Sequence, residues 1–268
     1  MIDESTLLSF AGLFADERQL EKDYLLNLML KTISINRASS HLEFKGGTAL
    51  YTLHGLDRFS EDLDFSYLGD AKKIGSEIDK LIGPVIKDFG LSYRIAKNKD
   101  NILVRDGAGG IVGVRSELFV EGPLFGKNGV RHKIKVDISA RQDTIEKPET
   151  ARFVSKYYDV GTVLTYSMPL RELLAEKLCA IMERDEARDV YDAYFILRYK
   201  DIAYDKEMLV KKLKLRREKF GEKELFGKIM GMKERAWKEE LSYLVRELPK
   251  LAEVKGFLLG LIGTGTPP

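Results

Sequence analysis

The chain has 268 residues, of which 44% are hydrophobic and 32% are charged, and its formal net charge is only +2. A chain of this length can bury roughly 70–75% of its unfolded surface, which is enough for two packed units. The small net charge excludes a global basic field, so any contact with nucleic acid must use a local patch. A single cysteine, Cys179, excludes an internal disulfide and fits a reducing compartment.

The N-terminal segment MIDESTLLSF is acidic and lacks the basic region of a signal peptide. The longest apolar runs, such as FLLGLIG near the end, are too short to cross a bilayer. We therefore expect a cytoplasmic protein with no membrane contact.

In the first third of the chain, hydrophobic spacing and turn residues predict helices alternating with strands. Apolar residues at three-and-four spacing predict a helix over 4–36, and a short strand is expected at 41–45. After a glycine turn, we expect a helix over 48–55 with Thr48 as its N-cap and a strand over 58–67. An amphipathic helix is expected over 71–90, broken or kinked at Gly83-Pro84.

From residue 91 the apolar period changes to that of strands. An antiparallel meander is predicted, with segments at 91–98, 101–106, 111–122 and 132–139. Residues 142–165 are expected to connect two parts of the chain through two short extended pieces, and from Pro169 the pattern is helical. The fold class is therefore α+β: a mixed sheet with flanking helices over residues 1–165, followed by a helical bundle over 166–268.

The stretch from Lys45 to Phe65, KGGTALYTLHGLDRFSEDLDF, carries the strongest chemical signal. Backbone N–H groups of a glycine turn at a helix start are suited to phosphate oxygens. Asp62 and Asp64 flank one leucine, so on a strand they project from the same face. Two adjacent carboxylates repel each other, and a hard divalent cation such as Mg²⁺ or Mn²⁺ removes that penalty. This combination predicts an enzyme that handles a nucleoside triphosphate; the alternative is a pair of solvent-facing acids on an edge strand.

Asp137 lies in the segment KIKVDIS, where Ile134, Val136 and Ile138 share one face of the predicted strand. Asp137 is on the other face, which makes it the candidate third carboxylate.

The helical half contains charges in apolar surroundings. Lys177 falls in the middle of an apolar stripe, and Arg184 follows on the same line. The side chain of Lys177 either reaches the boundary between the two halves or is directed into a cleft toward a triphosphate. Asp189 and Asp192 share one face of the next helix, and Lys177, Arg184 and Arg188 are the nearest cations in sequence. A structural ion-pair cluster and a catalytic cluster are both open interpretations.

The pattern GGT…RFSEDLDF, followed by a strand aspartate and a helical E-K-L…R…RD-x-x-D segment, resembles the nucleotidyltransferase superfamily. It is most similar to the AbiEii/AbiGii group, toxins of type IV toxin–antitoxin and abortive-infection systems. The likeness runs from about Phe44 to Tyr199. It implies a nucleotidyltransferase-like catalytic domain whose active-site cleft is closed by the helical domain, and a cognate antitoxin as partner.

The resemblance also implies roles for particular residues, which we state as expectations. Catalytic residues are expected to be Asp62, Asp64, Asp137, Lys177 and Asp189, with Asp192 as the alternative to Asp189. Metal ligands are expected to be Asp62, Asp64 and Asp137. Nucleotide contacts are expected from Lys45, Gly46, Gly47, Thr48, Arg58, Ser60 and Arg184.

The implied reaction is Mg²⁺- or Mn²⁺-dependent transfer of a nucleotide from an NTP onto an acceptor, tRNA or another RNA. In this hypothesis Asp137 completes a second metal position or accepts the proton of the attacking hydroxyl, and Arg58 and Lys177 add positive charge at the phosphates. The alternative is a non-catalytic module on the same scaffold that binds a nucleotide or RNA. The sequence does not identify the acceptor.

Overall fold

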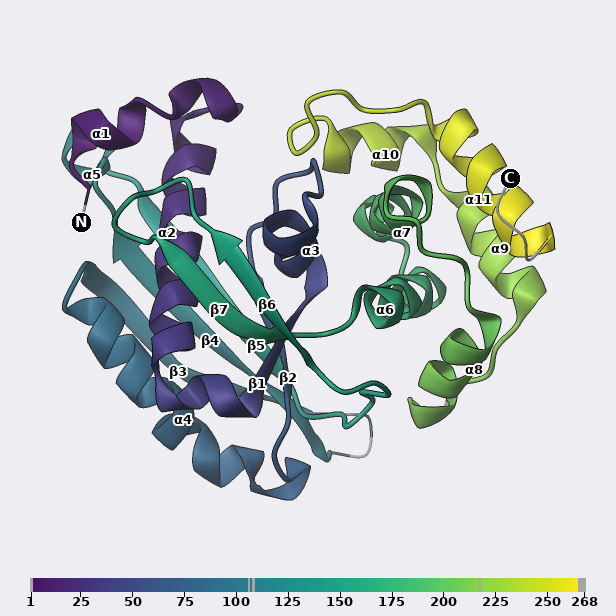
Figure 1. Ribbon diagram of the computed structural model, residues 1–268, viewed down its shortest axis with the longest axis horizontal. Coiled ribbons are helices and arrows are strands. Elements are labelled where there is room, and N and C mark those ends of the chain that lie inside the picture. The colour runs from purple at the N-terminus through teal and green to yellow at the C-terminus, as the bar shows by residue number, and fades with distance from the viewer. Residues whose placement is uncertain (1, 106, 108, 217, 265–268) are drawn as a thin grey trace. The chain divides into compact units, whose positions relative to one another are not determined.

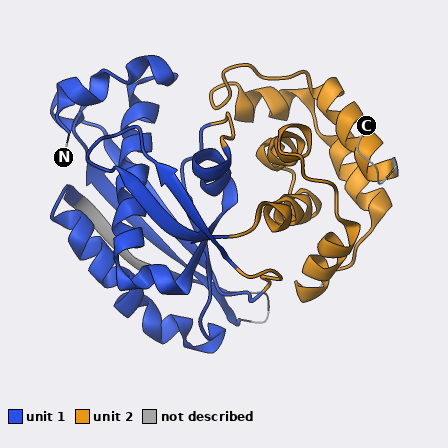
Figure 2. Ribbon diagram, in the orientation of Figure 1, with its two compact units in different colours: residues 1–54, 59–142, 148–167 blue, residues 55–58, 143–147, 168–268 orange. Residues whose placement is uncertain are grey.

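The computed structural model describes residues 2–105, 107, 109–216 and 218–264. It divides into two compact units, shown in different colours in Figure 2. Unit 1 comprises residues 1–54, 59–142 and 148–167, and unit 2 comprises residues 55–58, 143–147 and 168–268. Two short segments that precede residue 168, 55–58 and 143–147, thus belong to the unit that is otherwise formed by residues 168–268.

The described part of unit 1 contains a seven-stranded mixed sheet in the order β3-β4-β5-β2-β1-β7-β6 (Figure 1). The strands are β1 (Leu42–Lys45), β2 (Leu63–Tyr67), β3 (Arg94–Arg105), β4 (Ile111–Glu121), β5 (Arg131–Ser139), β6 (Glu149–Val154) and β7 (Thr162–Ser167). β2 runs antiparallel to β1 and parallel to β5, so the acidic strand lies in the middle of the sheet. β3, β4 and β5 form the expected antiparallel meander.

The two long helices of unit 1 cover one face of this sheet. The α-helices are α1 (Glu4–Leu8), α2 (Glu17–Ile35), α3 (Gly46–His54), α4 (Ile74–Gly90) and α5 (Phe125–Asn128), with short 3₁₀ turns at Ala11–Leu13, Arg37–His41 and Ala71–Lys73. α2 and α4 share one core with alternate residues of the strands, among them Phe44, Phe65, Ile134, Val136 and Ile138. Because strand side chains alternate, the intervening residues of β2 and β5, including Asp64 and Asp137, project from the opposite face.

Four local expectations differ from the structure. The helix expected over 4–36 is divided into α1, a 3₁₀ turn and α2, because Asp16 caps a new helix by accepting a 2.9 Å hydrogen bond from the Gln19 N–H. α3 begins at Gly46, so Thr48 lies in its first turn and is not the N-cap. β2 begins at Leu63, which leaves residues 58–62 outside the strand. α4 continues through Pro84 without a break.

The segment from 91 to 106 also differs from expectation, because β3 is one long strand and not two strands joined by a turn. The polar residues read as a turn coincide with a register irregularity between Lys99 and Ile102 in the pairing of β3 with β4. A bulge accommodates an extra residue without ending the strand.

Unit 2 is built from helices α6 (Leu170–Glu183), α7 (Ala187–Tyr199), α8 (Lys206–Leu215), α9 (Glu222–Gly231), α10 (Glu234–Leu241) and α11 (Leu251–Thr264). Ion pairs attach residues 143–147 to it: Arg216 binds the Asp143 carboxylate at 2.6 Å, and the fully buried Lys212 binds Glu172 at 2.5 Å. The Glu172 carboxylate in turn accepts hydrogen bonds from the N–H groups of Ile145 and Glu146. Across the described residues, no helix is long and apolar enough to span a membrane.

Candidate active site

The glycine turn and the acidic strand of unit 1 are in direct contact. β1 ends at Lys45, and Gly46 starts α3 with a φ of +75°, a region that L-residues with side chains rarely adopt. A Cβ atom placed on Gly46 would lie 2.3 Å from Oδ2 of Asp64. The absence of a side chain therefore allows the start of α3 to approach the carboxylate. The first N–H groups of a helix lack intrahelical partners, so this position is suited to an anionic ligand.

Asp64 and Asp137 are register partners on the neighbouring parallel strands β2 and β5. Adjacent strands are about 4.8 Å apart, and register partners project from the same face. Asp62 lies two residues before Asp64, directly ahead of β2. The structure thus brings Asp64 and Asp137 side by side, next to the Gly46 turn.

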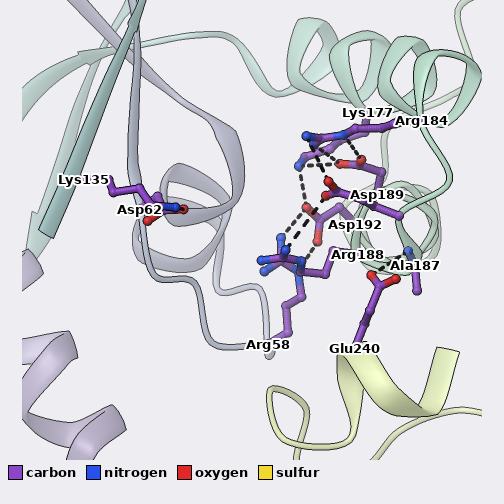
Figure 3. A network of polar contacts seen from close by, with 11 residues as sticks. Arg58, Asp62, Lys135, Lys177, Arg184, Ala187, Arg188, Asp189, Asp192 and Glu240 are labelled. Carbon is purple, nitrogen blue, oxygen red and sulfur yellow. Dashed lines mark hydrogen bonds and ion pairs between the residues drawn. The ribbon is translucent and has the colours of Figure 1, made fainter. Parts of the chain in front are cut away.

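The carboxylates of Asp62 and Asp137 are each paired with a cation. Lys135 Nζ lies 3.3 Å from Asp62 Oδ2, and this pair is visible in Figure 3. Arg115 Nε lies 2.7 Å from Asp137 Oδ1. These side chains are partly exposed, so the pairs are weak and a ligand of higher charge can compete for the carboxylates.

Thr48 and Ser60 connect α3 to the acidic segment. The Thr48 hydroxyl donates to the backbone carbonyl of Asp62 and lies 2.9 Å from Ser60 Oγ. Thr48 is buried, so its hydroxyl holds Asp62 in place from within the protein. Lys45 is also buried, and it is the register partner of Asp64 on β1.

Lys22 on α2 is a further charged residue near the acids. Its ammonium donates to the backbone carbonyl of Lys133, at a point where β5 has passed beyond its pairing with β2. Burial lowers the pKa of Lys22 to about 8, against the opposing effect of the negative charges of Asp62 and Glu61. This lysine therefore supplies the hydrogen bond that a neighbouring strand supplies elsewhere in the sheet.

Unit 2 contains a compact buried ion-pair cluster, drawn in Figure 3. Lys177 Nζ lies 3.1 Å from Asp189 Oδ1 and 2.7 Å from Asp192 Oδ2. Arg58 binds both oxygens of Asp192 at 2.6 and 2.7 Å, and Arg184 binds both oxygens of Asp189 at 2.8 and 3.2 Å. Each aspartate therefore forms a bidentate ion pair with its own arginine, in addition to its contact with Lys177.

The charges of this cluster stabilise one another. Burial by itself would raise the pKa of Asp192, but Arg58 and Lys177 outweigh it and hold the pKa below its usual value. Burial likewise opposes protonation of Lys177, and the carboxylates of Asp192 and Asp189 nevertheless raise its pKa. Asp192 and Lys177 are accordingly charged at neutral pH.

The expected site residues thus fall into two groups, each brought together within its own unit. Lys45, Gly46, Gly47, Thr48, Ser60, Asp62, Asp64 and Asp137 are in unit 1; Arg58, Lys177, Arg184, Asp189 and Asp192 are in unit 2. Sequence reasoning named Lys177 and Arg184 as partners of the acids but missed Arg58, which it had assigned to the phosphates. It also missed Arg115, Lys135 and Lys22; among these, Lys135 carried a signal, because it lies two residues before Asp137 and shares its face.

The carboxylates of unit 1 are the candidate ligands of a divalent cation. Within the described parts of the chain, no group of three or more His, Cys, Asp or Glu side chains is arranged to hold a metal ion. Mg²⁺, however, is commonly bound through one or two carboxylates together with substrate phosphates and water. Asp64 and Asp137 provide two hard oxygen ligands beside the helix start at Gly46, so the donor set fits such an ion.

Comparison with known proteins now identifies the family. The profile of the family described as "Nucleotidyl transferase AbiEii toxin, Type IV TA system" matches residues 28–257, most of the chain. The chain belongs to the AbiEii family. It is a nucleotidyltransferase of the toxin type, and the family implies a nucleotide substrate and an antitoxin partner. No curated protein sequence gave a significant match.

Solved structures share the fold of this AbiEii protein. JHP933 from Helicobacter pylori is 22% identical, with a TM-score of 0.59 over 93% of this chain and 92% of that chain. MenT4, a nucleotidyltransferase toxin from Mycobacterium tuberculosis H37Rv, is 17% identical, with a TM-score of 0.61 over 96% of this chain and 87% of that chain. Both similarities support the fold class expected from the sequence, a mixed sheet with flanking helices followed by C-terminal helices, which is therefore confirmed.

Proposed function

We propose that this AbiEii protein transfers a nucleoside monophosphate from an NTP onto the hydroxyl of an RNA, with tRNA as the first acceptor to test, and that the reaction depends on Mg²⁺ or Mn²⁺. The observation that carries the proposal is the contact between the Gly46 turn and Asp64, with Asp137 beside Asp64 on the next strand. A phosphate-binding helix start and a pair of carboxylates at one place are what nucleotidyl transfer requires.

In this proposal the N–H groups at the start of α3 bind the terminal phosphates, and Gly46 and Gly47 admit them because neither has a side chain. The acceptor oxygen bonds to the α-phosphorus, the bond from that phosphorus to the bridging oxygen breaks, and pyrophosphate leaves. Asp64 and Asp137, with Asp62, would hold the divalent cation, which supplies charge neutralisation on the phosphates. In the alternative, Asp137 accepts the proton of the attacking hydroxyl and does not bind the cation. Thr48 and Ser60 keep Asp62 in position through their hydrogen bonds.

We further propose that Lys177 and Asp189 are required for transfer. Support comes from the charge balance of the cluster in unit 2. Asp192 is paired with Arg58 and Asp189 with Arg184, so each carboxylate already has an arginine. Lys177 is thus not needed to neutralise the acids, which favours a role in the reaction.

Two broader assignments complete the proposal. The protein acts in the cytoplasm, where NTPs and RNA are available. Its activity arrests growth unless a cognate antitoxin is present, so expression of the wild type alone should stop growth and expression of Asp64→Ala should not. Harmless expression of an active wild-type enzyme would count against the toxic role.

Transfer itself is tested by incubating the protein with each α-³²P-labelled NTP, Mg²⁺ and total tRNA. Labelled RNA and released pyrophosphate are expected, and EDTA should abolish both. Labelled protein in the same lanes would show that the acceptor is a side chain. Nucleotide binding without turnover for all four NTPs would instead favour the non-catalytic module.

A further inference from the structure

The sheet face that carries Asp64 and Asp137 continues along β4 and β5 as a row of cross-strand pairs, most of whose side chains are charged. The cross-strand pairs on this face are Arg115 with Asp137, Glu117 with Lys135, Phe119 with Lys133 and Glu121 with Arg131. α2 and α4 pack against the opposite face, so no helix of that layer covers these pairs. The row extends from Asp137 to Arg131, which is seven residues of β5 or about 20 Å.

Cations lie outermost in this row and acids lie beneath them. The side chains of Arg131 and Lys133 are 52% and 43% exposed, whereas those of their partners Glu121 and Glu117 are 7% and 9% exposed. Arg94, on the neighbouring β3, is 77% exposed and also reaches Glu121, at 3.4 Å. An approaching molecule therefore meets positive charge first, although the net charge of the whole chain is small.

The pairing of these cations does not prevent them from binding an anion. The Lys133–Glu117 distance is 3.7 Å, and Arg131 presents an exposed guanidinium with several N–H groups. Exposed ion pairs of this kind contribute little to stability, so the cations can turn toward a phosphate at small cost. Phe119 is half-buried within the row and adds an aromatic surface. Cations that follow a backbone, with an aromatic ring between them, are the pattern that binds single-stranded nucleic acid.

We propose that this strip, formed by Phe119, Arg131 and Lys133, binds the single-stranded 3′ end of the acceptor RNA and leads its terminal hydroxyl to Asp64 and Asp137. The direction in which the RNA lies along the strip follows from the proposed function, and the inference rests on that function to this extent. The terminal nucleotide lies at the carboxylates, and the preceding phosphates lie along β5 toward Arg131. Phe119 stacks on a base, which gives affinity without sequence preference.

The test compares the double variant Arg131→Gln/Lys133→Gln and the single variant Phe119→Leu with the wild type. Arg94 still contacts Glu121 in the double variant, so the buried Glu121 carboxylate keeps a cationic partner. Lys80→Gln removes an exposed charge from α4, the helix on the other face, and serves as control. Thermal melting verifies that all variants are folded.

Binding of a short fluorescein-labelled single-stranded RNA is measured by anisotropy at several salt concentrations, without NTP. The double variant should bind roughly tenfold or more weakly, and the slope of log affinity against log salt should fall by about 0.7 for each lost phosphate contact. Phe119→Leu should weaken binding at least about fivefold with an unchanged slope. In transfer assays the KM for RNA should rise and the KM for NTP should stay the same.

The other outcomes decide against either the strip or the proposed function. Wild-type RNA affinity in both variants, with normal transfer, would mean that the function is right and RNA enters elsewhere. A raised KM for NTP with unchanged RNA affinity would assign the cations to the triphosphate. A wild type that binds no RNA would overturn the strip, and a wild type that binds RNA through the strip but transfers nothing to it would overturn the proposed function alone.

Discussion

The carboxylate of Asp64 occupies the space where a side chain of residue 46 would be. A Cβ on Gly46 would lie 2.3 Å from Asp64 Oδ2 and only 2.9 Å from Asp64 Cβ. One of the two elements must move if this glycine is replaced, because the nearest atoms belong to a short side chain on a central strand.

Gly46→Ala should therefore impair transfer far more than folding. We expect kcat/KM for NTP to fall about 100-fold or more, since a displacement of about 1 Å at a reacting centre can have that effect. The positive φ adds a stability loss of about 1–2 kcal/mol. Gly126→Ala is the control, because no atom lies within 4 Å of the position that its Cβ would occupy and its φ is not positive. Equal kinetics for both variants would mean that the turn does not hold phosphate.

Lys135 should compete with the divalent cation for Asp62. Their 3.3 Å ion pair is partly exposed, so its removal costs the fold little. We expect Lys135→Gln to lower the Mg²⁺ concentration at half-maximal activity several-fold, because one positive charge is removed beside the ligands. Titration of transfer with Mg²⁺ measures this directly. An increased requirement for Mg²⁺ would instead make Lys135 a substrate contact.

Arg58→Gln should cost more stability than Lys177→Met, whereas Lys177→Met should abolish activity. Arg58→Gln removes both hydrogen bonds of the arginine from the fully buried Asp192 and leaves only Lys177 on it, so its cost should approach that of a broken buried pair, about 3–5 kcal/mol. Lys177→Met leaves Arg58 on Asp192 and Arg184 on Asp189, so its cost should be clearly smaller. Urea unfolding of both variants gives the comparison, and transfer assays should show no activity for Lys177→Met. If Lys177→Met remains active, Lys177 is structural.

Lys22 should make stability depend on pH in the alkaline range. Its pKa is about 8 in the folded protein and 10.5 in the reference state, so the unfolded chain binds more protons between these values. Stability contributed at this residue therefore rises with pH from about 8 to 10.5 and is lowest below pH 8. Relative to Lys22→Met, the wild type should gain up to ~3 kcal/mol across that window. A constant difference in the free energy of unfolding would show that the ammonium is not desolvated.

The part of the site that was predictable from the sequence depends on local spacing. Alternation along strands placed Asp137 on the polar face of its strand, and the strand–turn–helix–strand order placed β1 beside β2. The start of α3 was misplaced by two residues, because glycine at Gly46 was read as turn, whereas its positive φ leads directly into the helix. The single strand β3 was missed because a polar stretch containing a bulge resembles a turn.

Contacts between residues that are distant in sequence were harder to predict from the sequence. Arg58 binds Asp192, 134 positions later, and no spacing rule links an arginine before β2 to the helix α7. Lys22 meets the carbonyl of Lys133 only because β5 extends beyond β2. Such partners are set by packing, so sequence can show that a buried acid requires a cation without showing which cation binds it.

The most direct measurement is transfer of label from α-³²P NTP to RNA by Asp64→Asn, an isosteric change that removes the charge beside Gly46. Asp88→Asn is the matched control, since Asp88 is exposed on α4. We predict no detectable transfer by Asp64→Asn, with an unchanged melting temperature, and full transfer by Asp88→Asn. Transfer at the wild-type rate by a folded Asp64→Asn protein would contradict the assignment of the active site.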